Sequence, residues 1–164
     1  LTGATAINCG NSHTAVLLND GKVILCGDNS SGQLGNNSTT DSSLPVYMRN
    51  TEDSADLTGA SAISCGNSHT AVLLTNGKVI SCGKNSSGQF GNNSETLSSV
   101  PVYMQNPENT GDLTGAVSTR CGNSHTVVLL NNGKVIPSQA CCMRFRLISK
   151  YSGFSSIPMY LLLF

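Results

Sequence analysis

The sequence predicts an all-β protein, a partial β-propeller built from four-stranded blades. The motif Cys-Gly-Asn-Ser-His-Thr occurs three times at a strict spacing of 56 residues, beginning at Cys9, Cys65 and Cys121. A period of this length is typical of solenoids, propellers and other repeat arrays. Within each repeat, short apolar runs alternate with turns rich in Gly and Asn, which favours strands over helices.

The block Leu-Thr-Gly-Ala marks the repeat boundaries, because it recurs in step at Leu1, Leu57 and Leu113. The first two repeats agree at 41 of 56 positions, so few positions are left to differ in function. The tail that follows the third repeat has no echo of the pattern and is interpreted as either a cap or a misread or truncated product. The predicted units are two full repeats, a truncated third repeat and a divergent tail, at residues 1–56, 57–112, 113–136 and 137–164.

The first half of each repeat predicts a hairpin preceded by one further strand. In repeat one, residues 5–9 are interpreted as a short strand, and residues 13–18 as a second strand that is largely apolar on both faces. A strand of that kind is expected to be covered on both sides, as when sheets stack around an axis. Asn-Asp-Gly at residues 19–21 favours a type I′ turn, with residues 22–26 as the return strand.

The second half of each repeat predicts an irregular loop and an outer strand. Glycines and asparagines in residues 27–37 suit a tight, irregular backbone. Residues 44–48 are interpreted as a fourth strand, since Pro45 is tolerated at a strand start or a sheet edge. An acidic, turn-rich connector at residues 49–56 leads to the next unit, so each repeat has the length of one blade.

Composition excludes two classes of partner. Nine basic and nine acidic residues give a net charge of zero, and charged residues make up only 11% of the chain. This balance provides neither a basic footprint for direct nucleic-acid binding nor a polybasic membrane patch. No run approaches the roughly 20 apolar residues of a membrane helix, so no membrane span is expected.

Five of the seven cysteines follow the repeat, and the remaining two lie in the tail. Repetition therefore explains most of the count, and we interpret the five as reduced, small apolar side chains rather than as one disulfide per repeat. Reduced cysteines favour a cytoplasmic or nucleocytoplasmic compartment, although the sequence does not fix one. The chain begins at Leu1 on a repeat boundary and without an initiator Met, which favours missing sequence upstream.

Taken together, the repeat reads Cys-Gly-x-x-His-Thr, then x-Gly-Lys-Val, then Cys-Gly-x-Asn-x-x-Gly-Gln-(Leu/Phe)-Gly, then Pro-Val. This pattern resembles the repeat of the regulator of chromosome condensation family, which implies blades of a seven-bladed β-propeller. The family often has Trp at the positions of Cys26 and Cys82, whereas this chain has no Trp. Two full units and part of a third fall short of seven, so a closed ring would need further sequence or several chains.

The repeated Cys9 and His13 invite a zinc interpretation, because thiolate and imidazole are preferred zinc ligands. We favour a structural role instead, with the His hydrogen-bonded to backbone within its own blade. The loop at residues 27–35 lacks the Gly-Lys-(Ser/Thr) ending of a phosphate-binding loop, and no carboxylate repeats beside the His. The sequence therefore predicts no catalytic residue, no cofactor and no metal.

Function is expected where the near-identical copies differ. The contrasts are Asp28 with Lys84, Thr39 with Glu95, Asp41 with Leu97, and Arg49 with Gln105. Opposite charges at one loop position would make the propeller rim electrically uneven and could select a partner. The candidate partner-binding residues are Asp28, Lys84, Asp41, Arg49 and Glu95.

These observations favour a non-catalytic protein–protein interaction scaffold. The family resemblance implies one alternative, guanine-nucleotide exchange on a small GTPase. Richness in Asn, Ser and Thr and the exact linkers favour another, an extracellular or surface adhesion array. Open blade edges also predict self-association, since unpaired edges and exposed faces favour it.

Overall fold

The computed structural model describes residues 2–138 and confirms the all-β prediction. The described residues form three antiparallel sheets, with strand orders β1-β2-β3-β4, β5-β6-β7-β8 and β11-β10-β9. They contain no helix, and hence none that could cross a membrane. The tail proposed from the sequence lies outside the described residues from residue 139 onward.

The strand bounds follow the repeat. The first sheet contains β1 (Ala4–Cys9), β2 (His13–Leu18), β3 (Val23–Gly27) and β4 (Ser42–Tyr47). The second contains β5 (Ala60–Cys65), β6 (His69–Leu74), β7 (Val79–Gly83) and β8 (Ser98–Tyr103). The third contains β9 (Ala116–Cys121), β10 (Thr126–Leu130) and β11 (Val135–Pro137). The predicted fourth strand thus begins two residues earlier than expected and ends at the tyrosine.

The hairpin between β2 and β3 corrects the predicted type I′ turn. The amides of Leu18 and Gly21 donate to Lys22 O and Leu18 O, so the loop has three residues rather than two. Gly21 has a positive φ of 77°, whereas the φ of Asp20 is not positive. This is a type I turn followed by a left-handed glycine, which relaxes the strands through a bulge. Asn-Asp-Gly suits this geometry because only its last residue needs positive φ.

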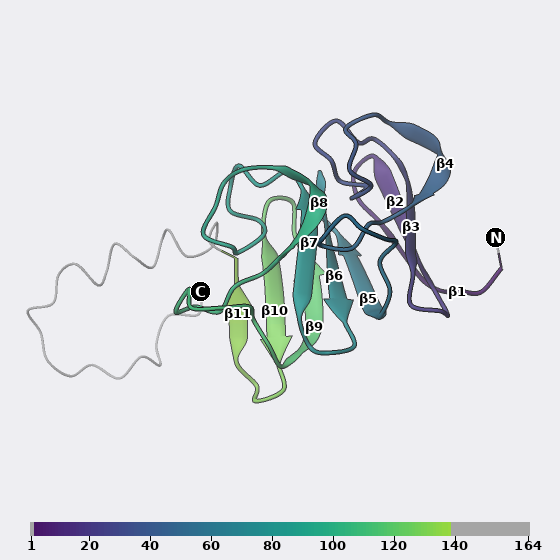
Figure 1. Cartoon of the computed structure of the whole chain (residues 1–164). Coiled ribbons are helices and arrows are strands. Elements are labelled where there is room, and N and C mark those ends of the chain that lie inside the picture. The colour runs from purple at the N-terminus through teal and green to yellow at the C-terminus, as the bar shows by residue number, and fades with distance from the viewer. Residues whose placement is uncertain (1, 139–164) are drawn as a thin grey trace, which may run out of the picture.

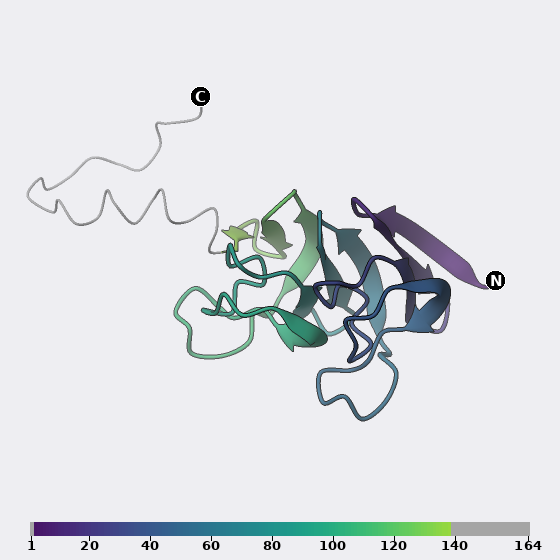
Figure 2. The same ribbon diagram turned by 90° about the horizontal axis from the view of Figure 1, so that it is seen from above.

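The three sheets stand side by side as successive blades, with the hairpins at one end and the longer β3–β4 and β7–β8 loops at the other (Figure 1). Seen from above, the first strands of the blades lie along one side and the outer strands β4 and β8 along the opposite side (Figure 2). Apolar side chains fill the spaces between blades: Leu17 and Val23 of repeat one share a core with Leu57 and Ile63 of repeat two. Strand β6, in the middle blade, is buried along its whole length, as expected for a strand apolar on both faces.

The repeated histidine joins each blade to the next. His13 Nε2 lies 2.9 Å from Thr70 Oγ1, and Thr70 Oγ1 donates to Gln33 O at 2.8 Å. Because threonine has a single hydroxyl proton, His13 is the donor in the first bond and carries a proton on Nε2. A Cβ at Gly10 would lie 2.6 Å from Gly66 O and would clash with the ring, so only glycine fits before this histidine.

We call this contact between neighbouring blades the seam. It recurs between repeats two and three, where His69 Nε2 lies 3.1 Å from Thr126 Oγ1. Both histidines therefore bond a side chain of the following blade, and the expected bond to backbone within their own blade was wrong. A second contact also repeats: Asn8 Oδ1 accepts the amide of Cys65 at 2.8 Å. Ser64 Oγ accepts the amide of Cys121 at 2.9 Å. Blades are thus linked by hydrogen bonds as well as by apolar packing.

Thr70→Val tests the seam. The substitution keeps the shape but leaves the buried His13 N–H without a partner and the Gln33 carbonyl with only the weak Cys82 thiol donor, so the free energy of unfolding should fall by about 1–3 kcal/mol. Thr14 is the matched control, because it holds the same register in repeat one and its side-chain hydroxyl lies 3.9 Å from Cys9 Sγ, too far for a strong bond. Thr14→Val should cost less than about 0.5 kcal/mol. Equal losses in urea denaturation of the two variants would contradict this account.

Burial between blades changes the acidity of these rings. It lowers the pKa of His69 from 6.5 to about 4, and repulsion from His13 and His125 contributes the smaller part of that change. Desolvation also lowers the pKa of His13, opposed by the attraction of Asp28. A depressed folded-state pKa means that the unfolded chain binds more protons between pH 6.5 and about 4. Stability is therefore retained above that window and is lost as pH falls through it.

We expect the free energy of unfolding to fall steeply between about pH 6.5 and 4.5, with His69 alone contributing up to about 1.4 kcal/mol per pH unit. His69→Gln removes the titrating group while keeping an amide that can donate to Thr126. The variant should be less stable at neutral pH but should have a flatter pH profile. A profile parallel to that of the wild type, measured by urea denaturation at each pH, would count against this role of His69.

Candidate functional site

The loops that follow β3 and β7 are organised around a buried asparagine. Asn29 Nδ2 donates to Asn36 Oδ1, Ser38 O and Thr40 O, and its Oδ1 accepts the amide of Leu34. Asn85 makes the corresponding contacts in repeat two. Each loop is thereby held as a compact unit at one end of its blade.

Two candidate residues, Asp28 and Asp41, help to build the loop of repeat one. Asp28 accepts the amide of Ser30 at 3.0 Å and the side-chain amide of Gln33 at 2.8 Å. The backbone hydrogen bond from Ser30 is the main reason why the pKa of Asp28 lies below its usual value. Asp41 Oδ1 accepts the amide of Asn29 at 2.8 Å. Both carboxylates already have partners within their own repeat.

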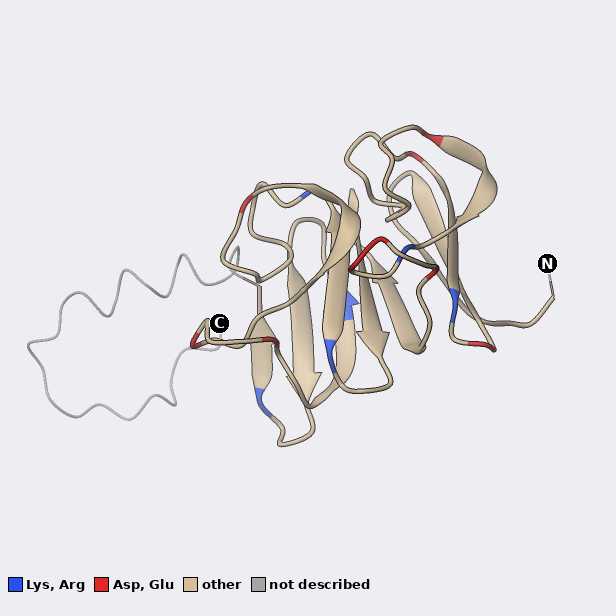
Figure 3. Cartoon of the chain, in the orientation of Figure 1, with Lys and Arg blue, Asp and Glu red and all other residues tan. Residues whose placement is uncertain are grey.

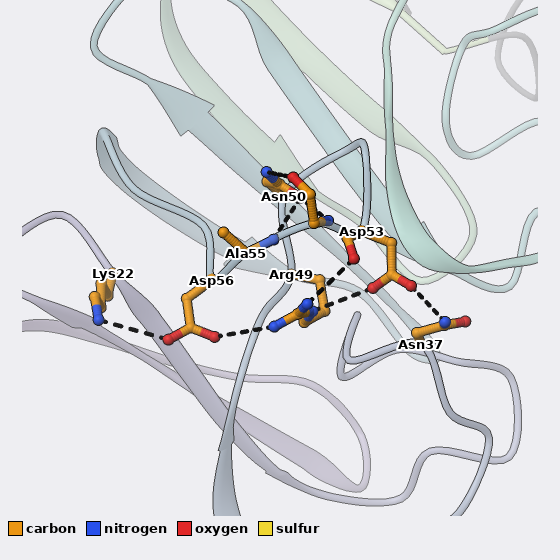
Figure 4. A network of polar contacts seen from close by, with 8 residues as sticks. Lys22, Asn37, Arg49, Asn50, Asp53, Ala55 and Asp56 are labelled. Atoms are coloured by element: carbon orange, nitrogen blue, oxygen red, sulfur yellow. Dashed lines mark hydrogen bonds and ion pairs between the residues drawn. The ribbon is translucent and has the colours of Figure 1, made fainter.

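A third candidate, Arg49, is held in the connector to repeat two (Figure 4). Its Nε lies 3.1 Å from Asp53 Oδ1, and its Nη1 lies 3.4 Å from Asp56 Oδ1. Asp56 also pairs with Lys22 at 3.5 Å, and Asn37 donates to Asp53. The guanidinium therefore fixes the connector against the hairpin and the loop of its own repeat.

In repeat two, both members of the Arg49–Asp53 ion pair are replaced. Gln105 stands at the register of Arg49, and Asn109 stands at the register of Asp53. The backbone is preserved, since Asp53 and Asn109 have φ values of 53° and 55°. The contrast between Arg49 and Gln105 thus has a structural explanation, the exchange of an ion pair for two neutral amides.

The remaining candidates, Lys84 and Glu95, belong to the loop of repeat two. Both side chains are exposed, and neither takes part in an ion pair within residues 2–138. The Lys84 amide donates to Ser68 O, which places this residue beside the β5–β6 turn. Charged residues lie mainly in loops and turns, while the strands are almost free of them (Figure 3). Of the five predicted residues, these two alone have a charged group with no hydrogen bond or ion pair to another described residue.

A hollow of about 500 Å³ lies at the turns between the first and second strands of the blades. Each repeat contributes the same three residues, Cys-Gly-Asn, and the asparagines are Asn11, Asn67 and Asn123. Sequence reasoning did not predict this site, since the motif was assigned to the framework. The available signal was the asparagine directly after each glycine, which the framework role leaves unexplained. Because Lys84 bonds the residue that follows Asn67, the hollow and the loop of repeat two share one end of the blade.

Two of the three cysteines at this hollow, Cys65 and Cys121, are held as protonated thiols. The five cysteines within residues 2–138 are free. Burial raises the pKa of Cys65 to about 12 and that of Cys121 above its usual value, so both stay protonated at neutral pH. The geometry also does not support a zinc site at His13, since its Nε2 is hydrogen-bonded to Thr70. Within the described part of the chain, no three His, Cys, Asp or Glu side chains are grouped to hold a metal ion.

Comparison with known proteins places these blades in a family. The profile of the Regulator of chromosome condensation (RCC1) repeat matches residues 20–73 and 76–129, and a second profile of that name matches residues 4–33 and 60–89. The human "Probable E3 ubiquitin-protein ligase HERC6" is 33% identical over 132 residues, which are 79% of this chain and 12% of the ligase. The rat "Probable E3 ubiquitin-protein ligase HERC4" is 33% identical over 122 residues, or 73% of this chain and 11% of the ligase.

Solved structures share the fold. Human WBSCR16 matches with a TM-score of 0.71 and 19% identity, over 84% of this chain and 33% of that one. Yeast RCC1 (Prp20), solved bound to Kap60, matches with a TM-score of 0.67 and 20% identity, over 84% of this chain and 32% of that one. At these identities the likeness shows the fold alone. The chain thus spans about an eighth of the curated relatives and a third of the solved structures.

Proposed function

Because the chain belongs to the regulator of chromosome condensation repeat family, we propose that it is part of a non-catalytic scaffold that binds a protein partner at one end of its blades. The binding surface comprises the hollow lined by Asn11, Asn67 and Asn123 and the adjoining loop with Lys84 and Glu95. The ligase activity in the relatives' names belongs to proteins of which this chain spans about an eighth.

The observation that carries the proposal is the uncommitted charge of Lys84 and Glu95. In repeat one, the carboxylates of Asp28 and Asp41 accept hydrogen bonds within their own loop. The loop of repeat two instead exposes the Lys84 cation and the Glu95 anion. Charges of this kind at a rim steer association and exclude wrong partners. The neighbouring asparagines add donors and acceptors that suit the polar backbone or side chains of a protein.

Charge reversal tests the surface. The immobilised full chain and its Lys84→Glu and Glu95→Lys variants would be exposed to cell extract, crosslinked and compared by quantitative mass spectrometry. At least one partner should be recovered about tenfold less with each variant, because like charges would then face each other. Lys134→Glu is the matched control, since Lys134 is exposed in the β10–β11 hairpin at the opposite end of the blade. Identical recovery by all four proteins would refute the proposed surface.

The same proteins address the nucleotide-exchange alternative. Prp20p from Saccharomyces cerevisiae, whose crystal structure matches with a TM-score of 0.64, has binding properties to Gsp1p and histones, which motivates a test on small GTPases. The assay measures release of labelled GDP from a small GTPase. If the full chain accelerates release, and Lys84→Glu reduces this effect while Lys134→Glu does not, the chain acts as an exchange factor rather than as a non-catalytic scaffold. Binding without release would support the scaffold.

A further inference from the structure

The loops that follow β3 and β7 share one backbone conformation. The Ser31 amide donates to Gln33 Oε1 at 2.9 Å, and the Ser87 amide donates to Gln89 Oε1 at the same distance. The backbone bond that closes the turn before this glutamine, from the glycine amide to the asparagine carbonyl, is 2.8 Å long in both repeats. Corresponding hydrogen-bond donors therefore point in corresponding directions in the two loops.

In repeat one, carboxylates of the same loop accept three of these donors. Asp41 Oδ1 accepts the amide of Asn29 at 2.8 Å. One oxygen of Asp28 accepts the amide of Ser30 at 3.0 Å, and its other oxygen accepts the side-chain amide of Gln33 at 2.8 Å. Hydrogen bonds to a carboxylate are stronger than those between neutral groups, so the loop of repeat one holds two anionic groups firmly.

Repeat two has lost both carboxylates. Lys84 stands at the register of Asp28, and Leu97 stands at the register of Asp41. An ammonium group only donates hydrogen bonds, and a leucine side chain makes none. Leu97 is 51% exposed, so it does not close the loop as the aspartate does. The exchange therefore removes every side-chain acceptor that serves the three donors in repeat one.

The corresponding donors of repeat two have no acceptor among the described residues. They are the amides of Asn85 and Ser86 and the Nε2 of Gln89. Gln89 is 2% exposed, and because its Oε1 accepts the Ser87 amide, its Nε2 is directed as that of Gln33 is. A buried N–H without an acceptor is costly, so this group marks a position where an acceptor fits.

These donors are not left open by the limits of the described chain. Repeat two lies between two described blades (Figure 1). Repeat one is followed by a complete blade, which contacts its loop at Gln33 O and at the Asn37 amide, not at the three donors. A following blade thus leaves this part of the loop alone, and the open donors follow from the exchange of the two aspartates.

We propose that the loop of repeat two binds a carboxylate of the partner protein, in the place that the Asp28 and Asp41 carboxylates occupy in repeat one. The three open donors supply hydrogen bonds to its oxygens, and the exposed Lys84 ammonium supplies the opposite charge. This inference rests on the proposed function, because it names the chemical group that the same surface recognises.

Nuclear magnetic resonance of the full chain tests the site with small probes. Sodium acetate is titrated at constant ionic strength, with acetamide as its neutral counterpart. We expect acetate, and not acetamide, to shift the signals of the Asn85 and Ser86 amides and the Gln89 side-chain amide in a saturable manner. Two tripeptides identify the source of the carboxylate: acetyl-Gly-Glu-Gly-amide offers only a side-chain carboxylate, and acetyl-Gly-Gln-Gly offers only a terminal one.

A double variant gives repeat two the carboxylates of repeat one. Lys84→Asp/Leu97→Asp should bind acetate at least about tenfold more weakly, because its own side chains then occupy the site. It should also unfold at a higher urea concentration than the wild type, since the three donors gain acceptors, an effect that added negative charge alone does not produce. Lys134→Asp, in the hairpin at the opposite end of the blade, is the control and should leave acetate binding unchanged.

The reverse exchange should create a second site. In Asp28→Lys/Asp41→Leu, acetate should also shift the Asn29 amide, and the number of bound acetate ions should rise from one to two. The proposal is overturned if no probe shifts the three wild-type signals, or if Lys84→Asp/Leu97→Asp responds as the wild type does. A partner whose recovery from cell extract depends on Lys84 would in that case leave the scaffold standing without the carboxylate. Carboxylate binding with no partner recovered would support the site and count against the scaffold.

Discussion

The contact on which this structure depends is the histidine held between two blades. The ring lies on the glycine of its own repeat, while its Nε2 reaches the threonine of the next. A short antiparallel sheet cannot bury both of its faces alone, so each blade needs a neighbour on either side. The Cys-Gly-x-x-His-Thr motif supplies both halves of this joint within six residues: glycine makes room, histidine donates, and threonine receives the preceding histidine. Identical motifs therefore give identical joints, which explains why this stretch is preserved letter for letter.

Much of the fold could be predicted from the sequence, because the 56-residue period and the turn residues constrain strands directly. The direction of the histidine contact could not. In an exact repeat, every threonine has a fixed sequence relation both to its own histidine and to the preceding one, so periodicity alone does not separate contacts within a blade from contacts between blades. The turn type was missed for a related reason: Asn-Asp-Gly fits a two-residue or a three-residue loop, and the hydrogen bonds of Leu18 decide between them.

The candidate site was predicted only in part, because a difference between copies has more than one cause. Arg49 differs from Gln105 as one half of a coupled exchange with Asp53 and Asn109, and that coupled change is visible in the sequence once both registers are aligned. Asp28 and Asp41 differ from their counterparts because they brace a loop. The hollow was missed altogether, because its asparagines are 56 residues apart in the chain and meet only when blades stand side by side.

Near-identical repeats create a problem of recognition that unrelated domains do not have. The contact between repeats one and two uses Asn8 as the acceptor, and the contact between repeats two and three uses Ser64 at the same register. Either side chain therefore serves at this position, and the contact carries little information about which blade follows which. The order of the blades within the chain is set by covalent linkage, and the framework residues then need only make each interface close well.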